Sequence, residues 1–309
     1  MASRLRPYAL AALIALAGCQ PKPAPVVVDT ATPDASVRAA VAGLKTGDLR
    51  ALVTTQVPPA ELERLRAEWK QKREEKPITD ADRKQFAETM AMLTAPDAEA
   101  ELYKKLDPQL AKMEAELAAQ IPMWVELGRG LAEGAIKSSK EMSEPQKQEA
   151  LKSLESIARW AKSIKITDRA QAKRSIAVVC RVARELKLKS LDEARALEFD
   201  QALDKFSIAF RGLKEILANY GLSLDRTLDT VKTETLAQNG DTARVAVSYT
   251  LIDVPVRYEA DLVRVDGRWY GKDALERLHK QKLGISDGSG DEPAEPAKPE
   301  PPAASGSKG

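Results

Sequence analysis

The spacing of apolar residues changes near Leu228, and this change limits the chain to a fold with two kinds of secondary structure. Before that point apolar residues recur every three or four positions, which is the period of a helix. Between Thr242 and Leu251 apolar and polar residues alternate instead, as in a strand with one buried face. We therefore predict an α+β fold: a mostly helical region, residues 34–228, followed by an antiparallel β-meander of about four strands with a terminal helix, residues 229–283.

Two dipeptides set the turns of the predicted meander. Asn239-Gly240 is expected to form a type I′ turn, because both residues accept a positive φ. Asp266-Gly267 should form a second tight turn of the same kind. The meander has one apolar face, so we expect a helix to cover it.

The clearest helical signal begins at Ser190, where Ser190-Leu191-Asp192-Glu193 predicts a capping box. One long helix should follow, with a seam of apolar side chains that packs in a bundle or against another chain as a coiled coil. Earlier in the chain, each proline is expected to open a new helix, so residues 96–136 should form two or three short ones. The seam consists of Phe199, Leu203, Phe206, Phe210, Leu213 and Leu217.

The amino terminus has the order of a secretory signal peptide. Arg4 and Arg6 precede an apolar run from Tyr8 to Ala17, and small residues follow it. A ten-residue helix covers only about half of the roughly 30 Å hydrocarbon thickness, so this run cannot span a membrane. We expect residues 1–18 to be removed.

The sequence Leu16-Ala17-Gly18-Cys19 resembles the lipobox of bacterial lipoproteins. The resemblance implies that Cys19 is lipidated and becomes the amino terminus, with the protein held on the membrane by its acyl chains. Gln20 is not Asp, which in this family favours the outer membrane, facing the periplasm. An ordinary signal peptide that happens to have a cysteine at this position is the alternative. Residues 19–33 contain four prolines and are expected to form an extended tether.

The charge balance argues against a nucleic-acid partner. The full chain has 48 Lys and Arg against 46 Asp and Glu, and loss of Arg4 and Arg6 with the signal peptide leaves the two signs equal. Nucleic-acid binders draw much of their affinity from net positive charge. Residues 284–309 are rich in Gly, Ser, Pro, Ala and Glu, so we expect a disordered tail.

One segment departs from this balance. Between Arg159 and Lys189 the chain has ten Lys or Arg and only two acids. These residues could simply form a solvated surface. The alternative is that they bind an anionic envelope component or another envelope protein. The residues that would carry such a contact are Lys173, Arg174, Arg181 and Arg184.

Three stretches, "GLKTGDLRALV" (43–53), "GDTARVAVSYTL" (240–251) and "ADLVRVDGRWYGKD" (260–273), resemble the nuclear-transport-factor-two-like, cystatin-like superfamily. The resemblance implies a curved sheet closed into a cone, although the long helical segment 59–190 departs from that family. Such a cone could hold a small apolar ligand or, less often, acid and base groups for catalysis. By position, the candidate pocket residues are Tyr249, Asp253, Tyr258 and Asp261.

Little else in the sequence indicates chemistry. His279 is the sole histidine, which removes most histidine-based mechanisms and multi-histidine metal sites. With Cys19 lipidated, Cys180 has no disulfide partner and is expected in the core, with a reactive thiol as the minor alternative. We therefore expect no catalytic activity, cofactor or metal. The predicted function is binding or scaffolding in the bacterial envelope.

Overall fold

The computed structural model describes residues 30–75, 77–116, 119–140 and 142–282. The predicted signal peptide, the lipidation site Cys19, most of the tether and the tail 284–309 lie outside these ranges. The α+β prediction is confirmed, because helices make up the chain as far as Asp229 and a four-stranded antiparallel sheet follows.

The elements follow one another with short connections. The helices before the sheet are α1 (Pro33–Thr46), α2 (Leu49–Gln56), α3 (Pro59–Glu75), α4 (Asp80–Thr94), α5 (Ala98–Glu116), α6 (Ile121–Ser138), α7 (Glu144–Ser163), α8 (Arg169–Leu186), α9 (Leu191–Ala196), α10 (Phe199–Asn219) and α11 (Leu224–Asp229). The sheet and the last helix are β1 (Lys232–Asn239), β2 (Thr242–Leu251), β3 (Val254–Val265), β4 (Arg268–Gly271) and α12 (Lys272–Lys282).

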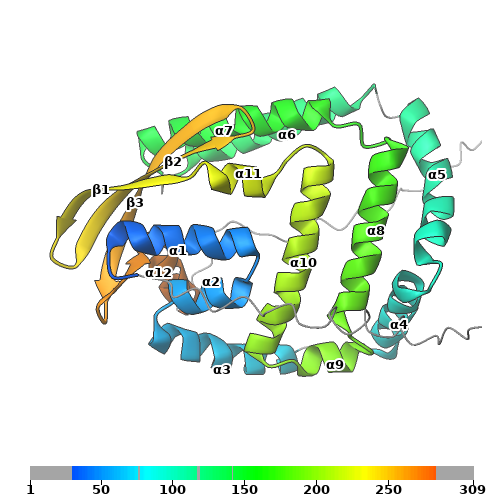
Figure 1. The fold of residues 1–309 in the computed structure, drawn as a ribbon, viewed down its shortest axis with the longest axis horizontal. Coiled ribbons are helices and arrows are strands. Elements are labelled where there is room, and N and C mark those ends of the chain that lie inside the picture. The colour runs from blue at the N-terminus through cyan, green and yellow to red at the C-terminus, as the bar shows by residue number, and fades with distance from the viewer. Residues whose placement is uncertain (1–29, 76, 117–118, 141, 283–309) are drawn as a thin grey trace, which may run out of the picture.

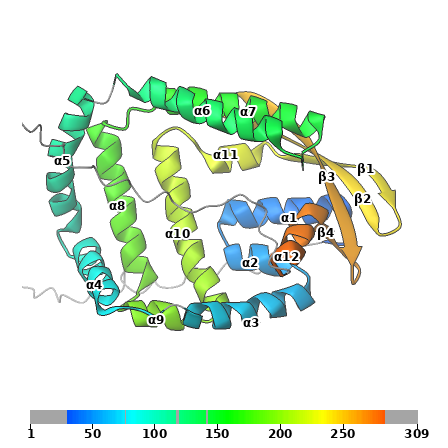
Figure 2. The same ribbon diagram turned by 180° about the vertical axis from the view of Figure 1, so that it is seen from behind.

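Several helices form a layer beside the sheet. In Figures 1 and 2, α10, α8 and α5 lie side by side, with α6 and α7 across one end and α3 and α9 across the other. Gly212 sets the spacing of α10 and α8, since a Cβ atom there would lie 2.4 Å from Cγ2 of Val182. The absence of a side chain at this position lets the two helices approach closely.

The predicted helix from Ser190 is divided in two. Ser190 caps α9 as expected, but Glu193 accepts a hydrogen bond from the backbone of Lys189 rather than of Ser190. The chain leaves the helix at Leu197, whose carbonyl accepts hydrogen bonds from Trp69 and Arg73 of α3 at 2.9 and 2.8 Å. In a continuous helix this carbonyl would accept a hydrogen bond from a backbone N–H of the next turn. Here the side chains of Trp69 and Arg73 donate to it instead, which explains the break.

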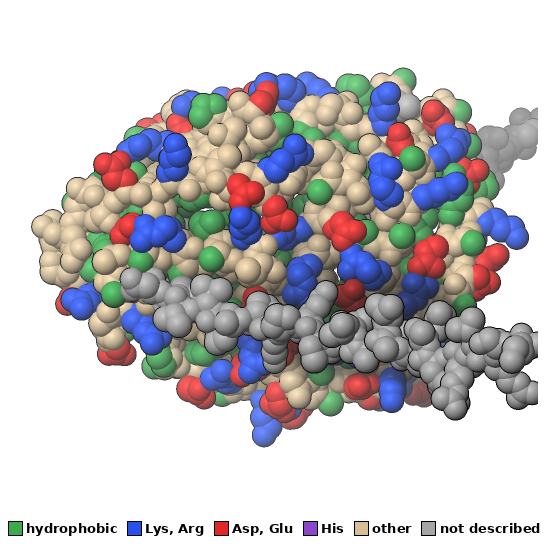
Figure 3. Space-filling model, in the orientation of Figure 1, with side chains coloured by type: hydrophobic (Ala, Val, Ile, Leu, Met, Phe, Trp, Pro, Cys, Tyr) green, Lys and Arg blue, Asp and Glu red, His purple; other side chains and the backbone are tan. Residues whose placement is uncertain are grey.

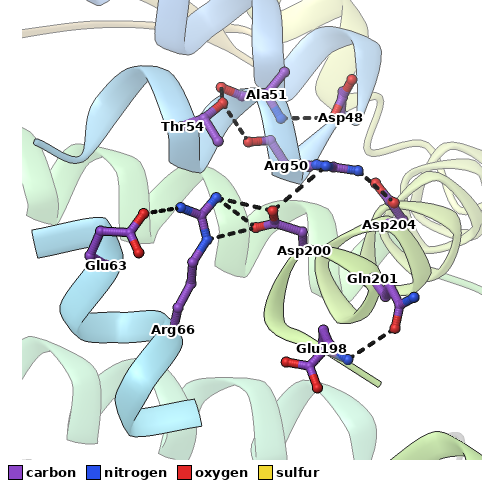
Figure 4. Close-up of polar contacts among 10 residues, drawn as sticks. All are labelled: Asp48, Arg50, Ala51, Thr54, Glu63, Arg66, Glu198, Asp200, Gln201 and Asp204. Atoms are coloured by element: carbon purple, nitrogen blue, oxygen red, sulfur yellow. Dashed lines mark hydrogen bonds and ion pairs between the residues drawn. The ribbon is translucent and has the colours of Figure 1, made fainter. Parts of the chain in front are cut away.

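The apolar seam of α10 is only partly covered. Leu203 is buried, whereas Phe206 and Leu213 are each 50% exposed. Polar contacts also fix this helix: Arg66 of α3 donates two 3.0 Å hydrogen bonds to Asp200 (Figure 4). Arg50 of α2 pairs with the neighbouring Asp204 at 3.0 Å.

One proline does not open a helix as predicted. Pro108 lies inside α5, which runs unbroken from Ala98 to Glu116. Proline removes one helical hydrogen bond and is disfavoured in a helix interior. Arg169 of α8 pairs with Asp107 and Glu114 on either side of the proline, and these tertiary contacts help to hold the helix together.

The sheet has the order β1-β2-β3-β4 with every pair antiparallel. Asp266 and Gly267 both have positive φ, as a type I′ turn requires. The first turn differs from the prediction by one residue, because Asn239 pairs with Thr242 and Gly240-Asp241 occupy the centre. Only Gly240 has a positive φ there, the pattern of a type II′ turn.

The apolar face of the sheet is filled where α1 packs on it. Val245, Val247, Leu262 and Trp269 form a buried cluster with Ala243, and Val37 of α1 packs on it. Helix α1 thus covers this part of the sheet, as the one-sided pattern predicted. Side chains therefore fill the sheet face under α1, whereas Tyr249 and Tyr258, farther along the same face, line a groove that is described below.

Candidate functional site

A groove beside the sheet contains two of the four predicted pocket residues. It has a volume of about 670 Å³ and lies between α7, the paired ends of β2 and β3, and α12. We call it the β3 groove. The residues used below to define it are Gln146, Glu149, Tyr249, Tyr258, Asp273 and Arg277.

Tyr249 and Tyr258 lie together on one wall of the β3 groove. Their ring centroids are 6.3 Å apart and the planes meet at 75°, an edge-to-face arrangement. Both residues are on the face of the sheet that carries the apolar core, because Val247 pairs with Tyr258 and Tyr249 with Val256. Tyr258 is nevertheless 40% exposed, so it offers a ring surface to a ligand.

The phenol of Tyr258 is a hydrogen-bond donor rather than a base. Partial burial, and then the neighbouring Tyr249, raise the pKa of Tyr258 above its usual value. A raised pKa keeps the phenol protonated at neutral pH. This chemistry suits recognition and does not favour proton abstraction.

The other two predicted residues are placed elsewhere. Asp261 pairs with Arg244 across the sheet at 2.9 Å and lines an adjoining hollow of about 650 Å³, which shares Glu149 and Tyr258 with the β3 groove. Asp253 lies at the β2–β3 turn and pairs with Arg159 of α7 at 3.1 Å. The four residues therefore do not converge on one acid–base site.

Helix α7 lies along part of an otherwise unpaired strand edge. β4 pairs only with Leu262 to Val265 of β3, so the earlier part of β3 has no strand on that side. Glu149 of α7 accepts a hydrogen bond from the backbone N–H of Arg257 at 3.1 Å. Lys152 and this N–H lower the pKa of Glu149, which favours the ionised carboxylate that accepts the bond.

The opposite wall of the β3 groove carries charged side chains of α12. Asp273 and Arg277 of α12 are exposed and form no ion pair within the described residues. Sequence reasoning missed these two residues and Glu149. Glu149 and Arg257 are 108 positions apart, and nothing local in either segment indicates that they meet.

Two of the four cations of the predicted basic contact pair with acidic residues of the same chain. Arg184 pairs with Glu99 of α5, Arg181 pairs with Glu185 and Glu215, and Lys173 lies 4.3 Å from the ring centre of Tyr103. Of the four cations, Arg174 alone has no such contact within the described residues. Figure 3 likewise shows both signs interspersed on the face in view. Binding of an anionic component at this position stays a prediction.

Cys180 and His279 are the other reactive side chains that the sequence analysis considered. Cys180 is completely buried, and burial raises the pKa of its thiol, so the thiolate is disfavoured. His279 lies 3.3 Å from Glu61 on the surface. Among the described residues there is no cluster of three or more His, Cys, Asp or Glu that could bind a metal ion.

In the part of the chain that the structure covers, no helix has both the length and the apolar character to cross a bilayer. The chain matches no protein-family model, no curated protein and no solved structure. The lipoprotein and cone-superfamily resemblances therefore stay predictions.

Proposed function

We propose that the chain is a lipid-anchored periplasmic protein that binds an extended peptide segment of another envelope protein in the β3 groove. The single observation that carries this function is the open edge of β3, which runs along the hollow that adjoins the β3 groove. The anchor rests on the lipobox resemblance around Cys19, and outer-membrane placement rests on Gln20.

The strand edge supplies backbone groups for a peptide. The N–H of Arg257 faces away from β2, since it donates to Glu149 of α7. Successive residues of a strand alternate in direction, so the N–H of Glu259 faces the same way. Glu259 precedes the part of β3 that pairs with β4, and this donor can therefore pair with an added strand.

Side chains around the edge supply further contacts. Tyr258 offers a ring and a protonated hydroxyl, and α12 offers a carboxylate and a guanidinium at Asp273 and Arg277. A peptide has both amide groups and charged side chains, so it can use both walls. The sheet face under α1 is filled, and the walls of the β3 groove carry charged as well as aromatic residues, so a peptide fits it better than the alternative of a small apolar ligand in a cone.

The peptide proposal is tested by a backbone-specific substitution. Peptides are selected from a displayed library on the purified chain, and their affinities are measured for Glu259→Pro and for the control Glu259→Ala. Proline removes the N–H and is tolerated at strand edges. We expect about tenfold weaker binding for the proline variant, about 1.4 kcal/mol and the value of one hydrogen bond, with little change for alanine.

Proline at position 259 could also distort the strand, so substitutions of Tyr258 test the same site independently. Tyr258→Ala should weaken the same peptides, while Tyr258→Phe should retain most of the stacking contribution. Equal affinities for all four variants and the unaltered chain would refute peptide binding in the β3 groove.

The anchor is tested separately by metabolic labelling with a radioactive fatty acid. The unaltered chain should carry label and Cys19→Ala should not. Equal labelling of both would remove the lipoprotein assignment, whatever the peptide measurements give.

A further inference from the structure

Helix α6 exposes its apolar side. Met123, Trp124, Leu127 and Leu131 are 61, 58, 57 and 71% exposed, and they recur along one side of the helix over more than two turns. The other exposed residues between 122 and 135 are proline, glycine and alanine. This face therefore carries no charge at all.

Three of the four charged residues of α6, Glu126, Arg129 and Glu133, are only half-exposed and lie beside this face. Lys137, near the helix end, is exposed and pairs with Glu133. Arg129 donates 2.8 Å hydrogen bonds to Glu126 and Glu133. Glu126 also pairs with Lys162 of α7, the helix on which α6 packs. Water-exposed helices normally present charge outward and apolar residues inward, so the arrangement in α6 is the reverse.

Nothing described covers this apolar face. Its three glycines, at positions 128, 130 and 134, have no atom of the described chain within 4 Å of an added Cβ. Contiguous apolar patches on soluble proteins mark contacts with proteins, ligands or membranes. The question is which of these fits.

A second copy of the chain fits poorly. A single-helix patch of this kind offers on the order of a few hundred Å². Stable specific interfaces bury about 800 Å² per partner. Flanking surface would have to contribute more than half of such an interface.

A bilayer surface fits better, given the proposed anchor at Cys19. The eleven residues from Cys19 to Asp29 can span at most about 40 Å. A domain of this length has a radius of gyration of about 18 Å, so a tether of about 40 Å exceeds twice that value and leaves the domain free to turn against the membrane. The tether also keeps the effective concentration high, and a weak apolar contact is then enough.

We propose that the face of α6 formed by Met123, Trp124, Leu127 and Leu131 lies on the lipid bilayer and orients the folded domain. This inference rests on the proposed anchor. The helix would lie in the interfacial plane, with Trp124 at the boundary between headgroups and acyl chains, a position that tryptophan favours.

Trp124 itself reports on the contact. Of the four tryptophans, it is the only one that is more than half exposed; Trp269 is buried, and Trp69 and Trp160 donate to backbone carbonyls. The full-length protein is bound to vesicles of phosphatidylethanolamine with a minor fraction of phosphatidylglycerol, with and without brominated acyl chains. Brominated lipid should quench a measurable share of the emission, and Trp124→Phe should abolish that share.

A second pair of variants tests the face without altering the fluorophore. Leu127→Gln with Leu131→Gln should reduce the quenching severalfold, whereas Met92→Gln, which changes an exposed residue on α4, should leave it unchanged. Failure of brominated lipid to quench vesicle-bound protein, or equal quenching in Trp124→Phe, would overturn the proposal. So would a dimer in solution that Leu131→Gln dissociates, because the occupant would then be a second copy.

An error in the proposed anchor can be distinguished from an error in the α6 contact. If Cys19→Ala binds vesicles as well as the unaltered protein, the anchor is not needed for attachment. Quenching through Trp124 in that variant would still support the α6 contact.

Discussion

The side chain of Ser36 donates a hydrogen bond to the backbone carbonyl of Trp269 at 2.6 Å, joining the first helix to the last strand across 233 positions. Both residues are about 1% exposed. The bond therefore lies in the core between α1 and the sheet, where an unsatisfied carbonyl is costly.

Replacement of Ser36 by alanine should destabilise the fold through this carbonyl. We expect the free energy of unfolding to fall by about 1–3 kcal/mol, the penalty for a buried acceptor left without a donor. Urea unfolding followed by circular dichroism measures the change. Ser153→Ala is the control, because the hydroxyl of Ser153 donates to the carbonyl of Glu149 in its own helix. A loss as large as that of Ser36→Ala would contradict the proposed role of the bond.

Gly212 and Gly130 should respond oppositely to alanine. Alanine favours a helix over glycine by about 1 kcal/mol, so Gly130→Ala, in open space, should stabilise the protein by up to that amount. Gly212→Ala places its Cβ against Val182 of α8, and overpacking costs about 1–3 kcal/mol, so we expect net destabilisation. Thermal unfolding of both variants measures the difference. Stabilisation by both would mean that α8 and α10 can separate freely.

The sequence predicted the elements of the fold better than their arrangement. The alternation between Thr242 and Leu251 located β2, although burial alternates only from Thr242 to Val245 and Ala246 is buried on the other face. The break at Leu197 was not predictable, because it depends on Trp69 and Arg73 from a helix far earlier in the chain. The same limit applies to Pro108, which local rules place at a helix start.

The candidate site was predicted only where it follows from strand register. Tyr249 and Tyr258 share a face because β2 and β3 form a hairpin, so their proximity could be derived from the sequence. Glu149 reaches β3 through tertiary packing alone. The basic segment illustrates the same limit, since the acids that neutralise it come from other helices: Glu99 lies on α5 and Glu215 on α10.

Lys214 should be important for joining α10 to the end of α1. Its side chain is only 8% exposed, and its ammonium group donates to the carbonyls of Leu44 and Lys45 and pairs with Asp225. Cations stabilise helix carboxyl ends, where backbone carbonyls lack partners.

Lys214→Met keeps most of the side-chain volume but removes the donor to the carbonyl of Lys45 and the partner of Asp225, while the carbonyl of Leu44 keeps the N–H of Gly47. We expect a loss of about 2–3 kcal/mol in the free energy of unfolding, measured by urea denaturation. Lys152→Met, at an exposed position, should change it by no more than about 0.5 kcal/mol. Equal effects for the two variants would show that the buried contacts of Lys214 add nothing to stability.

The pair between Glu99 and Arg184 should make part of the stability depend on acid pH. Arg184 donates two hydrogen bonds to the carboxylate, and these, with a backbone hydrogen bond, lower the pKa of Glu99 from 4.5 to about 2. A carboxyl whose pKa is lower in the folded state stabilises the fold fully above its unfolded pKa, and this contribution is lost as the pH falls. The window for Glu99 is therefore between pH 4.5 and about 2.

Glu99→Gln removes the titrating group while keeping a similar shape. At neutral pH the variant should be less stable than the unaltered chain, and the difference should shrink as the pH falls from about 6 to about 3. Because the pair is partly exposed, the difference should also shrink at high salt. Urea midpoints at several pH values measure it. Glu88→Gln, in a looser pair with Lys84 at 3.9 Å, is the control and should show little such trend. If the difference in stability between Glu99→Gln and the unaltered chain did not change with pH, the carboxylate of Glu99 would have the same pKa in the folded and the unfolded chain.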